Sequence, residues 1–114
     1  MIASANGPAP GARASSQTRG LRVPVDPLVY VNFPDESAFL LDLSENGMAV
    51  QCMDVLAPGH PYRFSFPLPD SIAELRGLAR IVWSDTSGRA GMQFISLSDF
   101  DRLALKMWIS RQCH

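Results

Sequence analysis

The residues best suited to chemistry in this chain lie in one short stretch, residues 42–47, with the sequence DLSENG. Residues 37–43 show the period-two pattern of a half-buried strand. Asp42 and Ser44 are therefore predicted to project from the same face, a carboxylate acceptor beside a hydroxyl donor. Such a pair could bind a ligand, or it could form a plain hairpin in which both side chains bond neighbouring backbone amides.

The end of the same stretch predicts a tight turn. Asn46 and Gly47 form a dipeptide typical of two-residue hairpins, and both are expected to have positive φ angles. The turn would direct the side chain of Asp42 away from the opposite face of the strand at 37–43. That opposite face is predicted to carry Phe39, Leu41 and Leu43.

Two arginines precede the first predicted strand. Arg19 and Arg22 are separated by a glycine-containing dipeptide that lets the chain bend. A guanidinium group can bind phosphate through two parallel hydrogen bonds or stack on a purine, and a carboxylate accepts hydrogen bonds from the N1 and N2 donors of guanine. Arginines with an Asp/Ser pair therefore suit a guanine nucleotide that carries phosphates. On their own, the same arginines would be ordinary solvated side chains.

No pattern in the sequence predicts catalysis or a metal site. His60 lies in a loop of Pro and Gly and His114 is the last residue, so neither lies in a context that orients an imidazole. Cys52 and Cys113 lack the paired spacing of zinc ligands or of a disulfide framework. We therefore expect a protein that is not an enzyme and that needs neither a metal nor a cofactor.

Six short strand patterns, separated by turn residues, must position these groups. The predicted strands are residues 27–33, 37–43, 48–52, 62–66, 74–84 and 90–95. The fourth has the cleanest alternation and is expected to place Tyr62, Phe64 and Phe66 in a core. Short strands joined by turns favour an all-β antiparallel barrel or sandwich over a parallel α/β sheet.

The hydrophobic period changes at Ser98, which predicts a C-terminal helix at residues 98–111 with Ser98 as its N-cap. One apolar stripe of this helix is expected to pack on the barrel: Phe100, Leu103, Ala104, Met107 and Trp108. Leu105 and Ile109 lie off that stripe, four residues apart. They are expected to form an exposed patch for a protein partner.

Length and composition limit the remaining possibilities. The 114 residues suit one domain, residues 19–114, after a disordered tail at residues 1–18 that consists mostly of Ala, Ser, Gly, Pro and Asn. A formal charge of −1 argues against binding a nucleic-acid polymer by bulk electrostatics. Because no apolar run suits a membrane span or a secretory signal, the protein is expected in the cytoplasm.

From residue 19 to about residue 109, the chain resembles the PilZ domain, a family of six-stranded β-barrels with a C-terminal helix that serve as receptors for cyclic di-GMP. Residues 42–47 fit the family's D/N-x-S-x-x-G motif at every defined position. Residues 79–84 and 91–94 resemble the strand pair that precedes the last helix of the family. These features cover most of the chain that is expected to be ordered.

The arginine motif of the family, R-x-x-x-R, is matched in part. Residues 22–25 resemble its end and the apolar entry to the first strand. With Arg22 as the second arginine, the first position falls on Thr18, and Arg19 lies one residue late. In the family these arginines clasp the phosphates and stack on the bases of the ligand.

The resemblance implies a binding site for cyclic di-GMP. It assigns Arg22 and, provisionally, Arg19 to phosphate clasping and base stacking. It places Asp42 and Ser44 against a guanine, with Gly47 permitting close approach. Ligand binding would then order the arginine segment against the barrel and create a new surface for a protein partner.

Two other functions remain open. One is a degenerate PilZ domain that binds no nucleotide and acts as a protein-interaction module, which Thr18 and the pair Leu105 and Ile109 would favour. The other is an OB-like barrel that binds single-stranded nucleic acid. That fold would need exposed aromatic residues interleaved with basic ones, whereas the aromatic residues here are predicted to alternate inward.

Overall fold

The computed structural model describes residues 21–26, 28–54 and 56–112. The predicted tail at 1–18 and the predicted site residue Arg19 lie outside the described residues. The elements are β2 (Val23–Pro24), β3 (Tyr30–Phe33), β4 (Glu36–Leu43), β5 (Gly47–Cys52), β6 (Tyr62–Pro67), β7 (Glu74–Ser84), β8 (Arg89–Leu97) and α2 (Asp99–Gln112). No helix in the described part of the chain has the length and apolarity that crossing a membrane requires.

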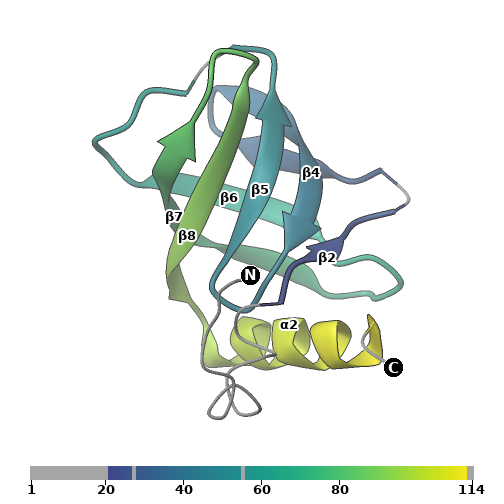
Figure 1. Ribbon diagram of the computed structural model, residues 1–114. Coiled ribbons are helices and arrows are strands. Elements are labelled where there is room, and N and C mark those ends of the chain that lie inside the picture. Colours follow the sequence, from purple (N-terminus) through teal and green to yellow (C-terminus); the bar gives the residue numbers. More distant parts are fainter. Residues whose placement is uncertain (1–20, 27, 55, 113–114) are drawn as a thin grey trace, which may run out of the picture.

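Six of the strands form a closed antiparallel barrel (Figure 1). Their hydrogen-bonded order is β4-β3-β6-β7-β8-β5, and β5 pairs back with β4. The short β2 pairs with β4 on the same edge as β3 does, farther along the strand. Next to β2, Val25 N donates to Leu41 O at 3.1 Å. The prediction of a six-stranded antiparallel β-barrel with a C-terminal helix is confirmed.

Aromatic rings fill the centre of the barrel. Phe64 and Phe66 of β6 are almost completely buried, and the ring of Phe64 stacks on that of Phe94 with centroids 5.3 Å apart. Tyr62, the third ring of the predicted alternation, is only partly buried and donates its hydroxyl to Ala57 O at 2.6 Å. Its polar end therefore reaches a hydrogen-bond partner at the rim while its ring contacts the core.

A β-bulge at Leu41 changes which side chains of β4 face the core. The register pairs Leu40 with Val50 and Asp42 with Ala49, so Leu41 has no partner on β5. As a result Leu40 and Leu43 are buried, while Leu41 is only partly covered. The predicted strict alternation is therefore broken at Leu41. Before the bulge, the buried face is that of Ala38 and Leu40, so the predicted face of Phe39 is also wrong.

Cys52 is buried at the end of β5, close to Glu36 of β4. Burial and, second to it, the Glu36 carboxylate raise the pKa of the Cys52 thiol from 9.0 to about 11. One carboxylate oxygen of Glu36 is itself buried without a hydrogen-bond partner. The thiol is therefore expected to stay protonated in the folded protein over the whole physiological range of pH.

This raised pKa predicts a loss of stability at alkaline pH. The folded state holds the Cys52 proton more tightly than the unfolded state, so its contribution is complete below pH 9 and is lost as the pH rises toward 11, by about 2 kcal/mol. Urea unfolding at pH 8 and pH 10.5 measures this change. The Cys52→Ala variant should lose less stability between the two values than the wild type does, and equal losses would contradict the assignment.

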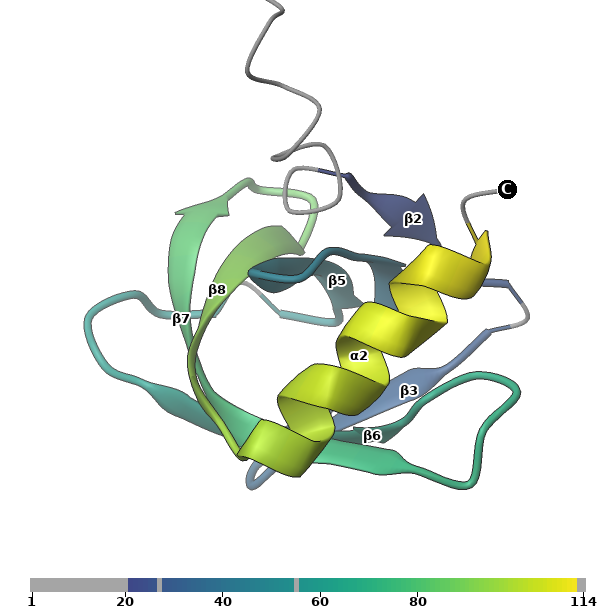
Figure 2. The same ribbon diagram turned by 90° about the horizontal axis from the view of Figure 1, so that it is seen from below.

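Helix α2 lies across one end of the barrel (Figure 2). Ser98 caps it as predicted, since Asp101 N donates to Ser98 Oγ at 3.0 Å. The acidic side chains of Asp99 and Asp101 lie in the first turn, where they suit the helix dipole. The start of the helix is therefore set by a local signal in the sequence.

The face of α2 that packs on the barrel differs from the prediction. Leu105, Trp108 and Ile109 are buried, with exposed fractions of 0%, 3% and 0%. Three members of the predicted stripe are exposed instead: Phe100, Leu103 and Met107. The helix carries apolar side chains on two faces, and its docking on the barrel decides which face is covered. The predicted partner patch at Leu105 and Ile109 is therefore wrong.

Candidate functional site

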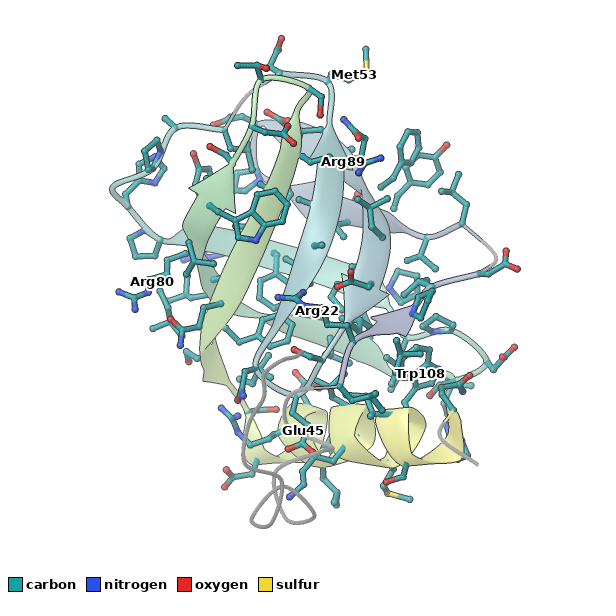
Figure 3. All side chains as sticks on the ribbon, in the orientation of Figure 1. Arg22, Glu45, Met53, Arg80, Arg89 and Trp108 are labelled. Atoms are coloured by element: carbon teal, nitrogen blue, oxygen red, sulfur yellow. The ribbon has the colours of Figure 1, made fainter. Side chains whose placement is uncertain are left out.

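Arg22 lies on the outside of the barrel (Figure 3) and contacts Asp42, because β2 pairs with the end of β4. Arg22 Nη1 donates to Asp42 Oδ1 at 3.0 Å, and the two side chains are 55% and 26% exposed. An ion pair this exposed contributes about 0–1 kcal/mol to stability, so either group can be released to a ligand at little cost. Two of the predicted site residues are therefore adjacent and accessible.

Ser44 lies in the turn that follows β4 and is 7% exposed. Its Oγ accepts hydrogen bonds from the backbone N–H groups of Asn46 and Gly47 at 3.3 and 3.2 Å, and donates to Gly47 O at 3.4 Å. One donor and two acceptor positions are the full capacity of a hydroxyl. Ser44 thus holds the turn in the structure, and its contact with a ligand, which stays a prediction, would require one of these bonds to be exchanged.

Gly47 is needed for close approach of two strands, and not for its φ angle. In the described residues, positive φ angles occur at Gly59, Asp70 and Gly88, so the predicted positive φ angles at Asn46 and Gly47 are wrong. The turn is closed by Ser44 N, which donates to Gly47 O at 2.9 Å, and by the Ser44 side chain. A Cβ on Gly47 would collide with the carbonyl oxygen of Met92 in β8.

A row of paired residues leads from Asp42 across the outer face of the barrel. Asp42 pairs with Ala49, Ala49 with Gly91, and Gly91 with Trp83. The indole of Trp83 packs against Gly91, where a Cβ would collide with it. Four adjacent strands span roughly 14 Å between the first and last residue of such a row. Because Ala49 and Gly91 are small, no bulky side chain stands in this row between the carboxylate of Asp42 and the partly exposed ring of Trp83.

Trp83 is a candidate site residue that the sequence pattern did not reveal. Strict alternation along β7 predicts Trp83 on the same face as Ile81, but the register shifts between these two residues. Trp83 is consequently exposed while Ile81 contacts the core. A small residue opposite a tryptophan, as Gly91 is here, is the sequence signal that the ring lies over the strand.

The larger hollows of the surface lie elsewhere. One of about 440 Å³ is lined by polar residues of β3, β6 and β7, such as Asn32 and Arg76, and by the rings of Phe33 and Phe64. Another, of about 370 Å³, is mainly apolar and lies beside Tyr30 and Phe39. Among the described residues, no three His, Cys, Asp or Glu side chains gather where they could hold a metal ion. A ligand at Asp42 would bind on an open face, which suits a large polar molecule better than a small apolar one.

The structure combines a small closed β-barrel, a helix across one end of it, and an Asp-x-Ser-x-x-Gly turn beside an arginine. The chain matches the PilZ domain family over residues 15–111. It therefore belongs to the PilZ domain family. The PilZ family has the fold of receptors for cyclic di-GMP, and its members are regulatory and binding domains.

Solved structures of PilZ domains resemble the chain. The PilZ domain of CeSA from a cellulose-synthesizing bacterium has 22% identity and a TM-score of 0.58, over 83% of this chain and all of that one. The PilZ domain of YcgR from Escherichia coli, solved with c-di-GMP, has 16% identity and a TM-score of 0.63, over 81% and 88% of the two chains.

A third solved structure is the inhibitor of motility MotI/DgrA from Bacillus subtilis, with 22% identity and a TM-score of 0.62. The match covers 82% of this chain and 50% of that protein. At these identities the likeness shows the fold alone. A search of curated proteins gave no match.

Proposed function

We propose that this protein is a cytoplasmic receptor for cyclic di-GMP that signals to a protein partner, without catalysis and without a cofactor. The observation that carries the proposal is the exposed contact of Arg22 with Asp42, two residues of the family's ligand motifs, at 3.0 Å on one face of the barrel. This contact brings a phosphate-binding cation and a guanine-binding carboxylate within reach of one ligand.

In the proposed mechanism, the ligand replaces the Arg22–Asp42 ion pair. The Asp42 carboxylate accepts hydrogen bonds from the N1 and N2 donors of a guanine, and the Arg22 guanidinium turns to a phosphate. Breaking the exposed pair costs about 0–1 kcal/mol, whereas each new hydrogen bond to a charged group contributes about 1.5–3 kcal/mol. The exchange of the ion pair for these bonds therefore contributes favourably to binding.

Other parts of the site complete the proposal. Ser44 and Gly47 keep the turn and the strand beneath it in place, as their hydrogen bonds and close packing indicate. The exposed ring of Trp83 offers a surface on which a base can stack at the far end of the row from Asp42. Arg19 would supply a second guanidinium. Ordering of the segment at residues 19–22 by the ligand would change the surface that a partner meets.

A second function is favoured by two specific observations. The Ser44 hydroxyl already makes all of its hydrogen bonds within the turn, and Thr18 occupies the first arginine position of the family motif. Both features suit a PilZ domain that binds no nucleotide and acts as a protein-interaction module.

A thermal-shift experiment separates the two functions. Cyclic di-GMP at 100 times its dissociation constant should stabilise a receptor by about 2.7 kcal/mol. For a domain of this size, that corresponds to a rise in Tm of about 10 °C or more. GMP tests whether the second nucleotide is needed for stabilisation, and cyclic di-AMP tests whether the guanine base is needed. The absence of both a Tm shift and saturable heat in calorimetry at high ligand concentration would favour the interaction module.

A further inference from the structure

Helix α2 carries a second apolar face that the barrel does not cover. Trp108 lies on the barrel side of the helix (Figure 3). Phe100, Leu103 and Met107, spaced i, i+3 and i+7, are 72%, 57% and 52% exposed. This spacing places them in one stripe along two turns of the helix. The fold therefore does not require these three apolar side chains, and a stripe of this kind marks an interaction surface.

Cationic side chains border the stripe. Arg102, Lys106 and Arg111 are exposed on the same helix. The salt bridges found among the described residues, Arg22–Asp42 and Arg76–Glu74, involve none of them. Asp99, at the start of the helix, is the one exposed acidic residue of α2. At 100° per residue, Lys106 and Arg102 lie on one side of the stripe, where Asp99 is next to Leu103, and Arg111 lies on the other side beyond Met107. The surroundings of the stripe therefore carry three positive charges and one negative charge.

We propose that the outer face of α2 binds an amphipathic helix of a protein partner whose apolar stripe is bordered by Glu and Asp. Helices that pack side by side bury one stripe each, with their axes 8–10 Å apart. Carboxylates flanking the partner's stripe would then face Arg102, Lys106 and Arg111, which gives both specificity and steering. Phe, Met and Arg are residue types enriched at such interfaces.

The arrangement of charges argues against a second copy of this chain as the occupant. Two α2 helices packed antiparallel, with Leu103 of one beside Met107 of the other, would bring Arg102 of each copy close to Lys106 of the other. Like charges held together in this way oppose association. An acidic partner removes the conflict because it meets the same cations with opposite charge.

The length of the stripe argues against a membrane surface. The stripe runs from Phe100 to Met107, which is about 10 Å along a helix axis. The strength with which a helix binds in the lipid interface scales with the apolar area that it buries there. The 14 residues of α2 already use one face to cover the barrel. Three side chains suit a protein groove or helix better than a bilayer.

This surface is exposed without any ligand, and it lies on α2 while the proposed nucleotide site lies on β4. The inference therefore goes beyond the proposed receptor function and does not depend on it. A variant that loses partner binding through α2 should keep its thermal response to cyclic di-GMP, so that failure of one proposal is distinguishable from failure of the other.

The experiment uses the full chain of 114 residues and a fluorescein-labelled model helix with a Leu stripe bordered by Glu, followed by fluorescence anisotropy. Saturable binding is expected, and Leu103→Asp should weaken it by at least about tenfold. The double variant Arg102→Glu/Lys106→Glu should weaken binding of the Glu peptide and strengthen binding of the same peptide with Lys in place of Glu. Met53→Asp is the matched control, since Met53 is an exposed apolar residue at the other end of the barrel (Figure 3).

Several results would overturn the proposal. These are no saturable binding of the Glu peptide, equal binding of a scrambled or Lys-substituted peptide, or no effect of Leu103→Asp. A dimer in light scattering that Leu103→Asp abolishes would show that a second copy covers the face. Co-sedimentation with phosphatidylglycerol vesicles that the same variant abolishes would assign the face to membranes. Circular dichroism checks that each variant folds, and the charge-reversal variant gives an independent result if Leu103→Asp does not.

Discussion

Arg22→Ala and Asp42→Asn should each weaken cyclic di-GMP binding by about 10- to 100-fold while leaving the fold intact. Each substitution removes hydrogen bonds between a charged group and the ligand, worth about 1.5–3 kcal/mol, and about 1.4 kcal/mol corresponds to tenfold in affinity. Asn keeps the size of Asp but presents an amide donor where guanine also offers donors. Isothermal titration calorimetry measures the loss.

The structure separates this effect on binding from an effect on stability. The Arg22–Asp42 pair is exposed and contributes about 0–1 kcal/mol, so the Tm of the free variants should stay close to that of the wild type. Because each single variant no longer has a pair to break before it binds the ligand, the double variant should lose more binding energy than the sum of the two single losses, by up to about 1 kcal/mol.

Arg80→Ala is the control for general electrostatic attraction. Arg80, on β7, is also exposed and lies away from Asp42. It donates to Gln93 Oε1 at 2.9 and 3.1 Å. Its loss should leave the dissociation constant unchanged. If Arg80→Ala weakened binding as much as Arg22→Ala did, the affinity would come from net charge. If the wild type bound the ligand and both site variants bound it equally well, the site assignment would be wrong.

Leu105→Ala should destabilise the protein by about 2–5 kcal/mol, whereas Leu103→Ala should change its stability by less than about 1 kcal/mol. Leu105 is fully buried between α2 and the barrel, so its truncation leaves a cavity. Leu103 is more than half exposed, and its truncation removes few contacts. Urea unfolding followed by circular dichroism measures both values.

These two variants form a matched pair, because the same side chain is shortened in the same helix, two residues apart. The comparison cancels the change in helix propensity and leaves the difference in burial. Equal losses would mean that α2 does not dock through the face that contains Leu105. A larger loss at Leu103 would restore the packing that the sequence pattern alone predicts.

Much of the fold was predictable from local patterns. The strand at residues 74–84 and the N-cap at Ser98 agree with β7 and with the start of α2. The alternation of Phe64 and Phe66 correctly predicts their burial. Alternation, turn residues and capping depend on neighbours a few positions away, so the sequence displays them directly.

The candidate site was predictable in part for the same reason. The motif at residues 42–47 correctly predicts the end of a strand and its turn, whereas the spacing of Asp42 and Ser44 does not show that Ser44 is buried and bonds the turn. The contact between Arg22 and Asp42 spans 20 residues of chain, and it forms because β2 pairs with the end of β4. Trp83 was missed because a register shift in β7, which depends on pairing with β8, turns its ring outward.

The sequence by itself determined the type and order of the elements and the family motif in the turn at residues 42–47. The tertiary structure alone decided that Leu41 is bulged, that Gly47 must be small to pass Met92, and that α2 buries Leu105 and exposes Leu103. The physical reason is that a helix with two apolar faces, or a strand with one extra residue, is equally consistent with its own local pattern. Only packing against residues distant in the chain selects one arrangement.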